Sequence, residues 1–310
     1  MRCVLLSQTL DLRQHLASEI ARLDGVISFV DHPDATADEV EMAVAWYPPA
    51  DGFARYPNLK AVCSIAAGAD SILHCPSLRD GIPVVRVVEH AQAQMMSGFV
   101  TWHVIWHQRN FRKHLAHQSE RRWDRFPQRP ARDVPVGILG YGEMGQRVAT
   151  DLSRLGFPVH AWSRTAKPMS DGIVGFHGKD GLAAMLRETE VLVNLLPLTP
   201  ETRGILNTEA FARMKRGGYV IQVGRGEHLV ETDLLAALDA GHLAGASLDV
   251  FLTEPLPVEH TFWVHPNIVL TPHDACDVSV PAVGQTIEST ARAIKAGTAL
   301  LHAVDRTLGY

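Results

Sequence analysis

The sequence has little cysteine and no long hydrophobic run, and both shortages limit what the protein can be. Its 4 cysteines, in a chain of 310 residues, form no Cys-X-X-Cys pair, so we expect neither a disulfide framework nor a cysteine-ligated metal site. No apolar stretch approaches the roughly 20 residues that span a membrane, and the apolar run at the N-terminus is too short for a signal peptide. We therefore expect a cytoplasmic protein without a membrane partner.

A surplus of positive charge is also absent. The chain has 29 Lys and Arg against 34 Asp and Glu, which gives a net charge of −5, so it is poorly suited to binding phosphate backbones. We therefore expect no nucleic-acid partner. Charged residues at 20% and hydrophobic residues at 46% are ordinary for a folded globular chain, and the length predicts two domains at about 150 residues each.

Short apolar strands alternate with helical segments along the whole chain, which is typical of α/β domains with parallel sheets. The expected strands are 2–7, 26–30, 42–46, 61–65, 83–88, 134–139, 159–162, 191–196, 219–223, 246–250 and 268–271. The fold class we predict is α/β, with two doubly wound parallel-sheet domains and the active site in the cleft between them. They are a flavodoxin-like substrate domain, residues 1–98 plus 283–310, and a Rossmann cofactor domain, residues 99–282.

Three helices matter for this organisation. One long helix is expected over 91–117, ahead of a charged, proline-containing break at 121–135. A second is expected over 232–240, with Thr232 as a candidate cap. The last, over 281–296, lies beyond the second sheet and is expected to return to the first domain.

A glycine-rich loop after the strand at 134–139 predicts a dinucleotide site. It fits the pattern Gly-X-Gly-X-X-Gly and consists of Gly140, Tyr141, Gly142, Glu143, Met144 and Gly145. An apolar strand enters the loop and an amphipathic helix leaves it, which is the context that the motif requires. The first glycine permits a tight turn, the second lets the backbone approach a pyrophosphate, and the third lets the helix pack close to the strand. Free N–H groups at the start of the helix then bind the anion.

The segment after the next strand indicates which dinucleotide is bound. An acidic residue there would bind a ribose 2′-hydroxyl, but the segment holds Ser163, Arg164 and Thr165, with Lys167 nearby. Ser163 and Arg164 are suited to bind a 2′-phosphate instead. We predict NADP as the cofactor, with NADPH preferred over NADH and NAD kept as the alternative.

Three polar residues in the second half of the chain carry the expected chemistry. Arg225, Glu254 and His273 each lie shortly after a predicted strand, and the carboxyl ends of parallel strands meet at one edge of a sheet. Arg225 would hold a carboxylate through two hydrogen bonds, and His273 would protonate a carbonyl oxygen as a hydride arrives. Glu254 would favour the charged imidazolium and so raise the pKa of His273. This set suits the reduction of a 2-oxo acid to a 2-hydroxy acid.

These segments resemble the D-2-hydroxyacid dehydrogenase family, and most closely its glyoxylate/hydroxypyruvate reductase branch of the A type. The matching segments are 194–202, 225–226, 233–238, 254–257, 271–273 and 304–310. The resemblance implies that Arg225, Glu254 and His273 are the catalytic residues. Two features depart from the branch, which more often has asparagine where Gln222 stands and small or apolar residues where Asp274 and Asp277 follow the histidine.

The resemblance also implies further binding residues. Asp249 would contact the nicotinamide carboxamide. Other residues would line the cofactor, namely Leu196, Pro197, Thr202 and Val223. The backbone of Ala67 and Gly68 would bind the substrate carboxylate, and Trp46 would close the pocket.

The 16 histidines offer a rival reading, a metal site. His103 and His107 stand four apart, and His114 and His117 three apart, on the helix expected over 91–117, and such spacing can bind zinc. No His-Glu-X-X-His pattern accompanies them and no third ligand is indicated, so we expect no metal. The helix is broadly apolar, and the resemblance implies that it packs against a second subunit in a homodimer.

Two functions from different classes remain. One is an NADPH-dependent reductase of small 2-oxo acids such as glyoxylate and hydroxypyruvate. The other is a non-catalytic NAD(P)-binding sensor or corepressor of the same fold. A pure sensor needs no acid paired with a carboxylate, so Arg225, Glu254 and His273 together favour the reductase.

Overall fold

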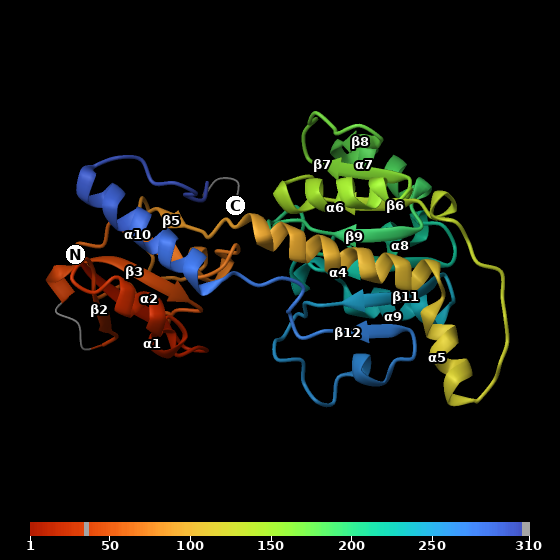
Figure 1. The fold of residues 1–310 in the computed structure, drawn as a ribbon, viewed down its shortest axis with the longest axis horizontal. Coiled ribbons are helices and arrows are strands. Elements are labelled where there is room, and N and C mark those ends of the chain that lie inside the picture. The colour runs from red at the N-terminus through yellow and green to blue at the C-terminus, as the bar shows by residue number, and fades with distance from the viewer. Residues whose placement is uncertain (34–36, 306–310) are drawn as a thin grey trace. The chain divides into compact units, whose positions relative to one another are not determined.

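A computed structural model describes residues 1–33 and 37–305, and the chain divides into two compact units (Figure 1). Unit 1 consists of Met1–His90 and Asp277–Tyr310, and unit 2 of Ala91–Cys276. The predicted domain boundaries, after residue 98 and before residue 283, lie a few residues further along the chain. The first of them falls inside a continuous helix, α4 (His90–Gln108). The end of the C-terminal segment that carries the family resemblance, 306–310, lies outside the described residues.

Unit 1 contains a parallel five-stranded sheet in the order β2-β1-β3-β4-β5. Its strands are β1 (Arg2–Ser7), β2 (Ser28–Asp31), β3 (Val40–Trp46), β4 (Ala61–Ser64) and β5 (Val84–Val85), and its helices are α1 (Leu12–His15), α2 (Ala17–Arg22), η1 (Ala37–Glu39), α3 (Asp70–Leu73) and α10 (Val280–Ala296). Along β1, Cys3 and Leu5 pack into one core while Val4 and Leu6 pack into another, because successive side chains point to opposite faces. Both faces of this sheet are therefore buried.

Unit 2 contains a parallel seven-stranded sheet in the order β12-β11-β10-β9-β6-β7-β8. Its strands are β6 (Val136–Leu139), β7 (Val159–Ser163), β8 (Ile173–His177), β9 (Val191–Asn194), β10 (Gly218–Gln222), β11 (Leu243–Leu248) and β12 (Ile268–Leu270). The chain builds outward from β6 through β7 to β8, then returns to β9 and builds outward the other way. The strand order thus reverses between β6 and β9, and at such a reversal α/β proteins bind their ligands.

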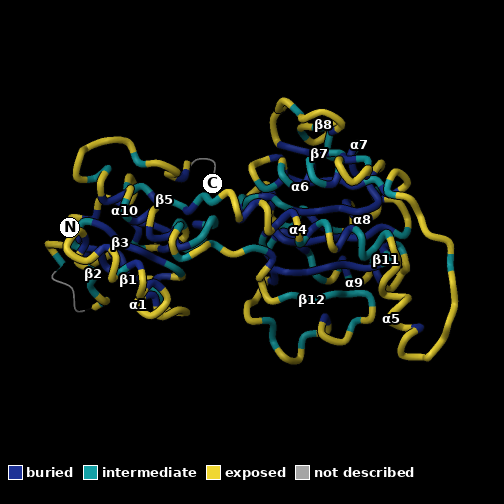
Figure 2. Tube along the Cα trace, in the orientation of Figure 1, coloured by how far each residue is buried: buried dark blue, intermediate teal, exposed yellow. Residues whose placement is uncertain are grey.

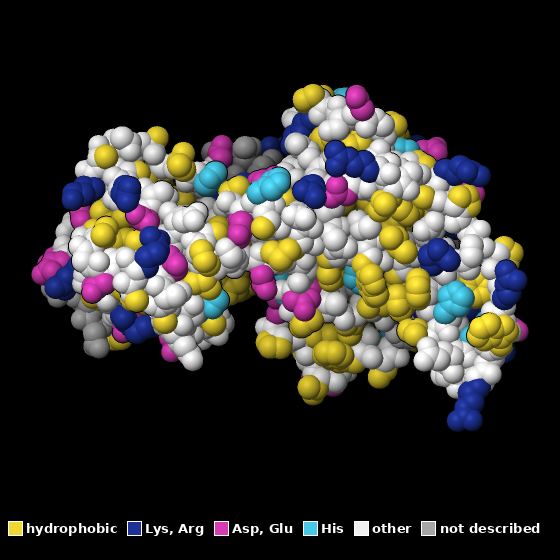
Figure 3. All heavy atoms as spheres, viewed as in Figure 1, with side chains coloured by type: hydrophobic (Ala, Val, Ile, Leu, Met, Phe, Trp, Pro, Cys, Tyr) yellow, Lys and Arg dark blue, Asp and Glu magenta, His cyan; other side chains and the backbone are white. Residues whose placement is uncertain are grey.

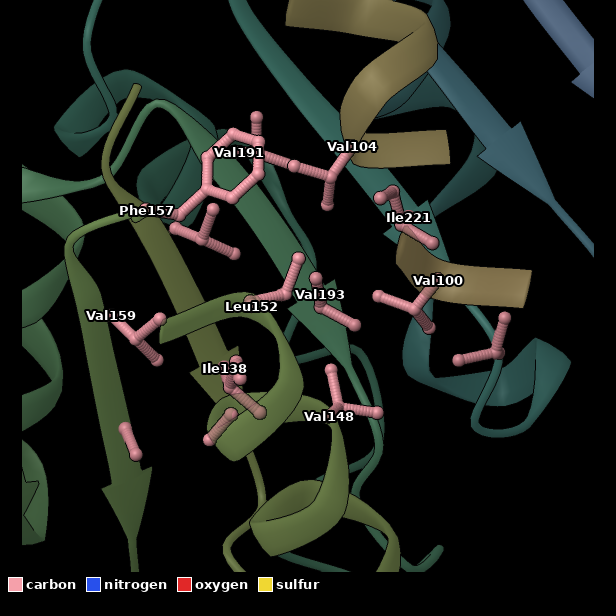
Figure 4. Close-up of a cluster of buried hydrophobic side chains, with 14 of the residues drawn as sticks. Val100, Val104, Ile138, Val148, Leu152, Phe157, Val159, Val191, Val193 and Ile221 are labelled. Carbon is pink, nitrogen blue, oxygen red and sulfur yellow. The ribbon is translucent and has the colours of Figure 1, made fainter. Parts of the chain in front are cut away.

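Helices cover both faces of the second sheet, as Figure 1 shows. They are α4, α6 (Glu143–Arg154), α7 (Gly178–Glu188), α8 (Thr208–Arg213) and α9 (Glu231–Asp239). The mostly exposed helix α5 (Phe111–Ser119) and the short turns η2 (Ala131–Asp133), η3 (Gly226–His228) and η4 (Thr261–Val264) complete the unit. On one face Val100 and Val104 of α4 meet Val148 and Leu152 of α6 over the strands (Figure 4). Side chains of α7, α8 and α9 fill the other face. In Figure 2 the central strands of this sheet run dark blue, because they are buried on both sides, whereas the edge strands β8 and β12 are more exposed.

The predicted fold class, two parallel-sheet α/β domains, is confirmed, but some elements differ from those expected. The single helix expected over 91–117 is wrong: α4 ends at Gln108 and α5 begins at Phe111. Asn110 between them has a φ of 53°, a left-handed conformation that cannot continue a helix and that asparagine tolerates better than most residues.

Three smaller differences concern single elements. Thr232 is not the cap of α9, because Leu229 and Val230 still pair with Leu206 and the helix begins at Glu231. The edge strand β8 was not expected, since only Ile173 of its residues is buried and no apolar alternation marks it. The short helix α8 was also not expected. None of the helices in residues 1–33 and 37–305 combines the length and hydrophobicity of a membrane span.

Candidate active site

The glycine-rich loop joins β6 to α6 and has a shape that suits a pyrophosphate. Gly140 has a φ of 100°, and a Cβ there would lie 2.9 Å from the Leu195 carbonyl oxygen. A Cβ on Gly145 would lie 1.9 Å from the carbonyl oxygen of Gly140, so only glycine lets α6 begin this close to the strand. A Cβ on Gly142, the residue before α6, would meet no atom within 4 Å. Open space at the start of α6, where N–H groups are unpaired within the helix, fits the phosphates of a dinucleotide.

Hydrogen bonds join the segment after β7 to the glycine-rich loop. The Lys167 ammonium donates a hydrogen bond to the Tyr141 carbonyl oxygen at 3.2 Å, and the Ser170 N–H donates to the Tyr141 hydroxyl at 3.1 Å. Ser163 is buried and its hydroxyl donates to the Thr165 carbonyl at 2.8 Å. Arg164, Thr165 and Lys167 are exposed. Two cationic side chains therefore follow the end of β7, where a 2′-phosphate would need them.

Arg225 lies in a tight turn after β10. Its N–H donates to Nδ1 of His228 at 3.0 Å, and its carbonyl oxygen accepts from Nε2 of Gln222 at 2.8 Å. A Cβ on the next residue, Gly226, would lie 2.0 Å from the carbonyl carbon and oxygen of Phe251. The arginine turn is thus packed against the backbone of the loop that follows β11.

Glu254 lies in that loop and pairs with His273. Nδ1 of His273 donates to Oε2 of Glu254 at 2.8 Å, while Oε1 accepts from the Phe251 N–H at 3.0 Å. Burial raises the pKa of Glu254, but the hydrogen bonds from His273 and Phe251 and the positive charges of His273 and Arg225 outweigh it, so the pKa lies below its usual value. Arg225, Glu254 and His273 therefore form one electrostatic group in unit 2.

Asp249, one residue beyond β11, holds the segment on both sides of His273. Its Oδ1 accepts hydrogen bonds from the Thr271 hydroxyl at 2.6 Å and from the Asp274 N–H at 3.0 Å, and its Oδ2 accepts from the Ala275 N–H at 3.1 Å. The carboxylate is buried. Its contact with a nicotinamide stays a prediction, and its bonds to this segment are an additional role.

Comparison with known proteins shows the family to which the chain belongs. Residues 101–275 match the family model "D-isomer specific 2-hydroxyacid dehydrogenase, NAD binding domain", which covers more than half of the chain. The chain belongs to the D-isomer specific 2-hydroxyacid dehydrogenases. Two relatives named glyoxylate/hydroxypyruvate reductase A, from Photorhabdus laumondii and Serratia proteamaculans, are each 40% identical to it, and each alignment covers 87% of this chain and 88% of the relative.

Solved structures of the family share the whole fold. A 2-hydroxyacid dehydrogenase from Xanthobacter autotrophicus, solved with NADPH and MES, has a TM-score of 0.92 at 37% identity, and covers 100% of this chain and 99% of its own. An NADPH-dependent glyoxylate/hydroxypyruvate reductase from Sinorhizobium meliloti, solved with NADP and sulfate, has a TM-score of 0.92 at 36% identity, with the same coverage. The predicted class, an NAD(P)-dependent oxidoreductase of the 2-hydroxyacid dehydrogenase family, is confirmed.

The other residues that the family resemblance indicated lie near strand ends. Leu196 and Val223 are buried just beyond the neighbouring strands β9 and β10. The Thr202 hydroxyl donates to the Pro197 carbonyl oxygen at 2.8 Å and so closes the turn after β9. These side chains border the same sheet edge as the glycine-rich loop. Their contacts with a cofactor stay a prediction.

The predicted substrate residues belong to unit 1 of this dehydrogenase. Trp46 is the last residue of β3, and Ala67 and Gly68 follow the adjacent parallel strand β4. The Ser64 hydroxyl donates to the Gly68 carbonyl oxygen at 2.7 Å and accepts from the Ala66 N–H at 3.1 Å. The turn after β4 is therefore held in place at the same sheet edge as Trp46.

The histidines of α4 and α5 make structural contacts. Burial lowers the pKa of His103 to about 4, and its Nδ1 pairs with the Ser247 hydroxyl at 2.6 Å. His107 donates to the Glu190 carboxylate at 2.9 Å, and His117 lies 2.6 Å from a guanidinium nitrogen of Arg122. His114 packs its ring against a phenylalanine. In the part of the chain that the structure describes, no cluster of three or more His, Cys, Asp or Glu side chains could hold a metal ion.

One buried polar group was missed by the sequence reasoning. His228 and Asn194 are fully buried beside the arginine turn, and Gln222, known only as a departure from the family pattern, joins them. The sequence does carry a signal for this network: Asn194 and Gln222 end the fully buried strands β9 and β10. Buried polar side chains need hydrogen-bond partners, so a polar network is expected there.

Proposed function

We propose that this dehydrogenase is an NADPH-preferring reductase that converts small 2-oxo acids, glyoxylate and hydroxypyruvate among them, into 2-hydroxy acids. The observation that carries the proposal is the 2.8 Å hydrogen bond between His273 and Glu254, in the same unit as Arg225 and the glycine-rich loop. An acid paired with a carboxylate, beside a cationic anion-binding group, is what the reduction of a carboxylate-bearing ketone needs. The Photorhabdus and Sinorhizobium proteins, both named glyoxylate/hydroxypyruvate reductases, support this substrate class.

Arg225 would bind the substrate carboxylate, because a guanidinium presents two parallel N–H donors to a carboxylate. The family resemblance assigns substrate-carboxylate binding also to the backbone of Ala67 and Gly68, and closure of the pocket to Trp46. The substrate would then be held with its keto group toward His273.

His273 would supply the proton. Its Nδ1–H donates to Glu254, which leaves Nε2 as the nitrogen that delivers a proton to the carbonyl oxygen. Because the pKa of Glu254 is lowered, the carboxylate stays charged at neutral pH and stabilises the imidazolium. NADPH, when bound, supplies the hydride that reduces the carbonyl carbon.

The chain's own residues would hold this cofactor at three places. The glycine-rich loop, residues 140–145, would bind the pyrophosphate at the start of α6. The segment after β7 would bind the 2′-phosphate, through the cationic Arg164 and Lys167 together with Ser163 and Thr165. The sheet edge would surround the nicotinamide half, through Leu196, Pro197, Thr202, Val223 and Asp249.

A homodimer is proposed from the surface of unit 2. Large apolar side chains lie exposed on α4 and α5 and in the segment that follows them, among them Trp102, Phe111, Leu115 and the 94% exposed Trp123. Figure 3 shows hydrophobic side chains along these helices. Several large apolar side chains exposed on the same two helices are more typical of an interface than of a solvated face. Light scattering should give twice the chain mass, and a monomer would contradict the dimer.

The test of the proposed function is the oxidation of NADPH, followed by absorbance, with glyoxylate, hydroxypyruvate and pyruvate. We expect turnover with at least one of them, and its loss in Arg225→Gln at unchanged NADPH affinity. NADPH binding without turnover of any small 2-oxo acid would overturn the proposal and favour the sensor or corepressor.

A further inference from the structure

His228 lies in η3, three residues after Arg225, and no part of it reaches solvent. Its Nδ1 faces two donors, the Arg225 N–H at 3.0 Å and Nδ2 of Asn194 at 2.9 Å. A backbone N–H can only donate, so Nδ1 is an acceptor and carries no proton. Nε2 lies 3.2 Å from the carbonyl oxygen of Pro197, which can only accept, so Nε2 carries the proton. The surroundings of His228 thus require one neutral tautomer.

Asn194 and Gln222 complete the same network. Nδ2 of Asn194 also donates to Oε1 of Gln222 at 2.7 Å, and Oδ1 of Asn194 accepts from the Leu196 N–H at 3.2 Å. Oε1 of Gln222 accepts in addition from the Gly224 N–H at 3.3 Å, while Nε2 donates to the Arg225 carbonyl oxygen at 2.8 Å. Each hydrogen of the Asn194 amide and each end of the Gln222 amide therefore has a defined partner.

We propose that His228, supported by Asn194 and Gln222, is the positioning residue for Arg225. Side chains hold both polar atoms of the Arg225 backbone: His228 accepts from the N–H, and Gln222 donates to the carbonyl oxygen. With both held, the direction in which the Arg225 side chain leaves the backbone is fixed. The inference rests on the proposed function, in which that side chain binds the substrate carboxylate.

The fit around Gly224 shows how tightly this network is built. A Cβ on Gly224 would lie 2.8 Å from Nδ1 of His228 and 2.9 Å from Nδ2 of Asn194, which is closer than a Cβ carbon comes to any non-bonded atom. Position 224 must be glycine for the two side chains to meet behind the turn. The network also explains Gln222: its amide reaches from Asn194 to the backbone of Arg225, across the turn.

Two matched variants, His228→Leu and His228→Asn, distinguish a role of His228 in positioning Arg225 from a role in packing alone. Leucine and asparagine have nearly the same shape, and both would lose the bond from Nε2 of His228 to Pro197. Only asparagine places an acceptor, its Oδ1, near the position of the His228 Nδ1. His228→Leu therefore removes the acceptor for the Arg225 N–H, and His228→Asn keeps it. Gln222→Met is a second variant: it loses the bond to the Arg225 carbonyl oxygen together with the bonds from Asn194 and from the Gly224 N–H, and it keeps His228 as the acceptor for the Arg225 N–H.

Two readouts are measured. The first is the KM for glyoxylate at saturating NADPH, and the second is hydrogen exchange of the Arg225 amide, followed by NMR in the chain without substrate. We expect His228→Leu to raise KM about tenfold with a smaller change in kcat, His228→Asn to recover most of that loss, and Gln222→Met to raise KM in the same direction. The Arg225 amide should exchange at least about tenfold faster in His228→Leu than in His228→Asn.

Equal KM values in His228→Leu and His228→Asn, or an unchanged KM in Gln222→Met, would overturn the inference, since a purely structural role does not depend on the acceptor. Should His228→Leu fail to fold, His228→Asn and Gln222→Met still decide it through KM. A wild-type chain that reduces no 2-oxo acid would instead overturn the proposed function. The exchange measurement then still decides whether His228 holds the arginine turn, because equal exchange in the two His228 variants would contradict it.

Discussion

His273 donates from Nδ1 to Oε2 of Glu254 at 2.8 Å while its own backbone has a φ of 58°. A non-glycine residue rarely takes this left-handed conformation, and it persists where neighbouring contacts fix it. Here the carboxylate of Asp249 accepts hydrogen bonds from the N–H groups of Asp274 and Ala275, immediately after the histidine. The orientation of the His273 imidazole is therefore fixed in two ways: by its hydrogen bond to Glu254, and by the backbone conformation that Asp249 holds.

Glu254→Gln should slow the reduction and move its pH optimum to lower pH. The neutral amide keeps the size of the side chain but no longer stabilises the positive charge on His273. We expect kcat to fall about 100-fold near neutral pH. The measurement is kcat/KM against pH for both proteins. Superimposable profiles would contradict the assigned role of Glu254.

Arg164→Ala should weaken the use of NADPH and leave the use of NADH unchanged. A hydrogen-bonded ion pair with a phosphate contributes about 1.5–3 kcal/mol, which corresponds to roughly a 10- to 100-fold loss in kcat/KM. Arg187→Ala is the control, because Arg187 is equally exposed but lies in the last turn of α7, just before β9 begins. An equal loss of kcat/KM with NADPH and with NADH would contradict the assignment of Arg164 to the 2′-phosphate site.

Tyr141→Phe should raise the KM for NADPH a few-fold and lower stability by about 1 kcal/mol. The hydroxyl of Tyr141 accepts from the Ser170 N–H at 3.1 Å, and its loss loosens the segment that carries Lys167. Tyr219→Phe is the matched control, since that hydroxyl is also buried and pairs with Ser247 at 2.8 Å, far along the sheet in β10. If the two variants change the KM for NADPH alike, Tyr141 does not position the segment.

Glu190→Gln should destabilise the protein at neutral pH and not in strong acid. Burial raises the pKa of Glu190, but the hydrogen bonds and charges of His107 and Arg129 outweigh it and lower the pKa to about 2. The folded protein therefore holds this proton less tightly than the unfolded chain does, so the stabilisation is present above pH 4.5 and is lost as the pH falls toward about 2. It amounts to something on the order of 3 kcal/mol.

Urea unfolding of wild type and Glu190→Gln at pH 7 and at pH 3 measures this. The difference in the free energy of unfolding between wild type and Glu190→Gln should be smaller at pH 3 than at pH 7. Glu209→Gln is the control, because its ion pair with Arg213 has a 74% exposed carboxylate and should contribute little at either pH. A gap that stays constant with pH would contradict the role of the Glu190 charge.

Local patterns made much of this molecule predictable. The glycine-rich loop needs one strand, one turn and one helix in sequence, and the spacing of Gly140 and Gly145 already implies the close approach that the structure has. Arg225, Glu254 and His273 were predictable as a group because parallel strands bring their carboxyl ends to one edge.

The features that the sequence did not predict depend on contacts between segments that are distant in the chain. Nothing near Asn110 in the sequence marks it as the break between α4 and α5, since the apolar residues continue on both sides. The three bonds that Asp249 accepts come from residues more than twenty positions later, and the Asn194 side chain that bonds to His228 lies 34 positions before it, at the end of β9. Such pairings are set by the register of the whole sheet, which local periodicity does not determine.

The absent side chain of Gly226 has a consequence for protein engineering. Because the backbone at Phe251 occupies the space that a Cβ would need, the turn that carries Arg225 and the loop that carries Glu254 are shaped against each other. Neither can be exchanged alone for the corresponding piece of a relative with a different backbone path. A graft meant to change substrate preference would have to move both pieces together, as one cassette.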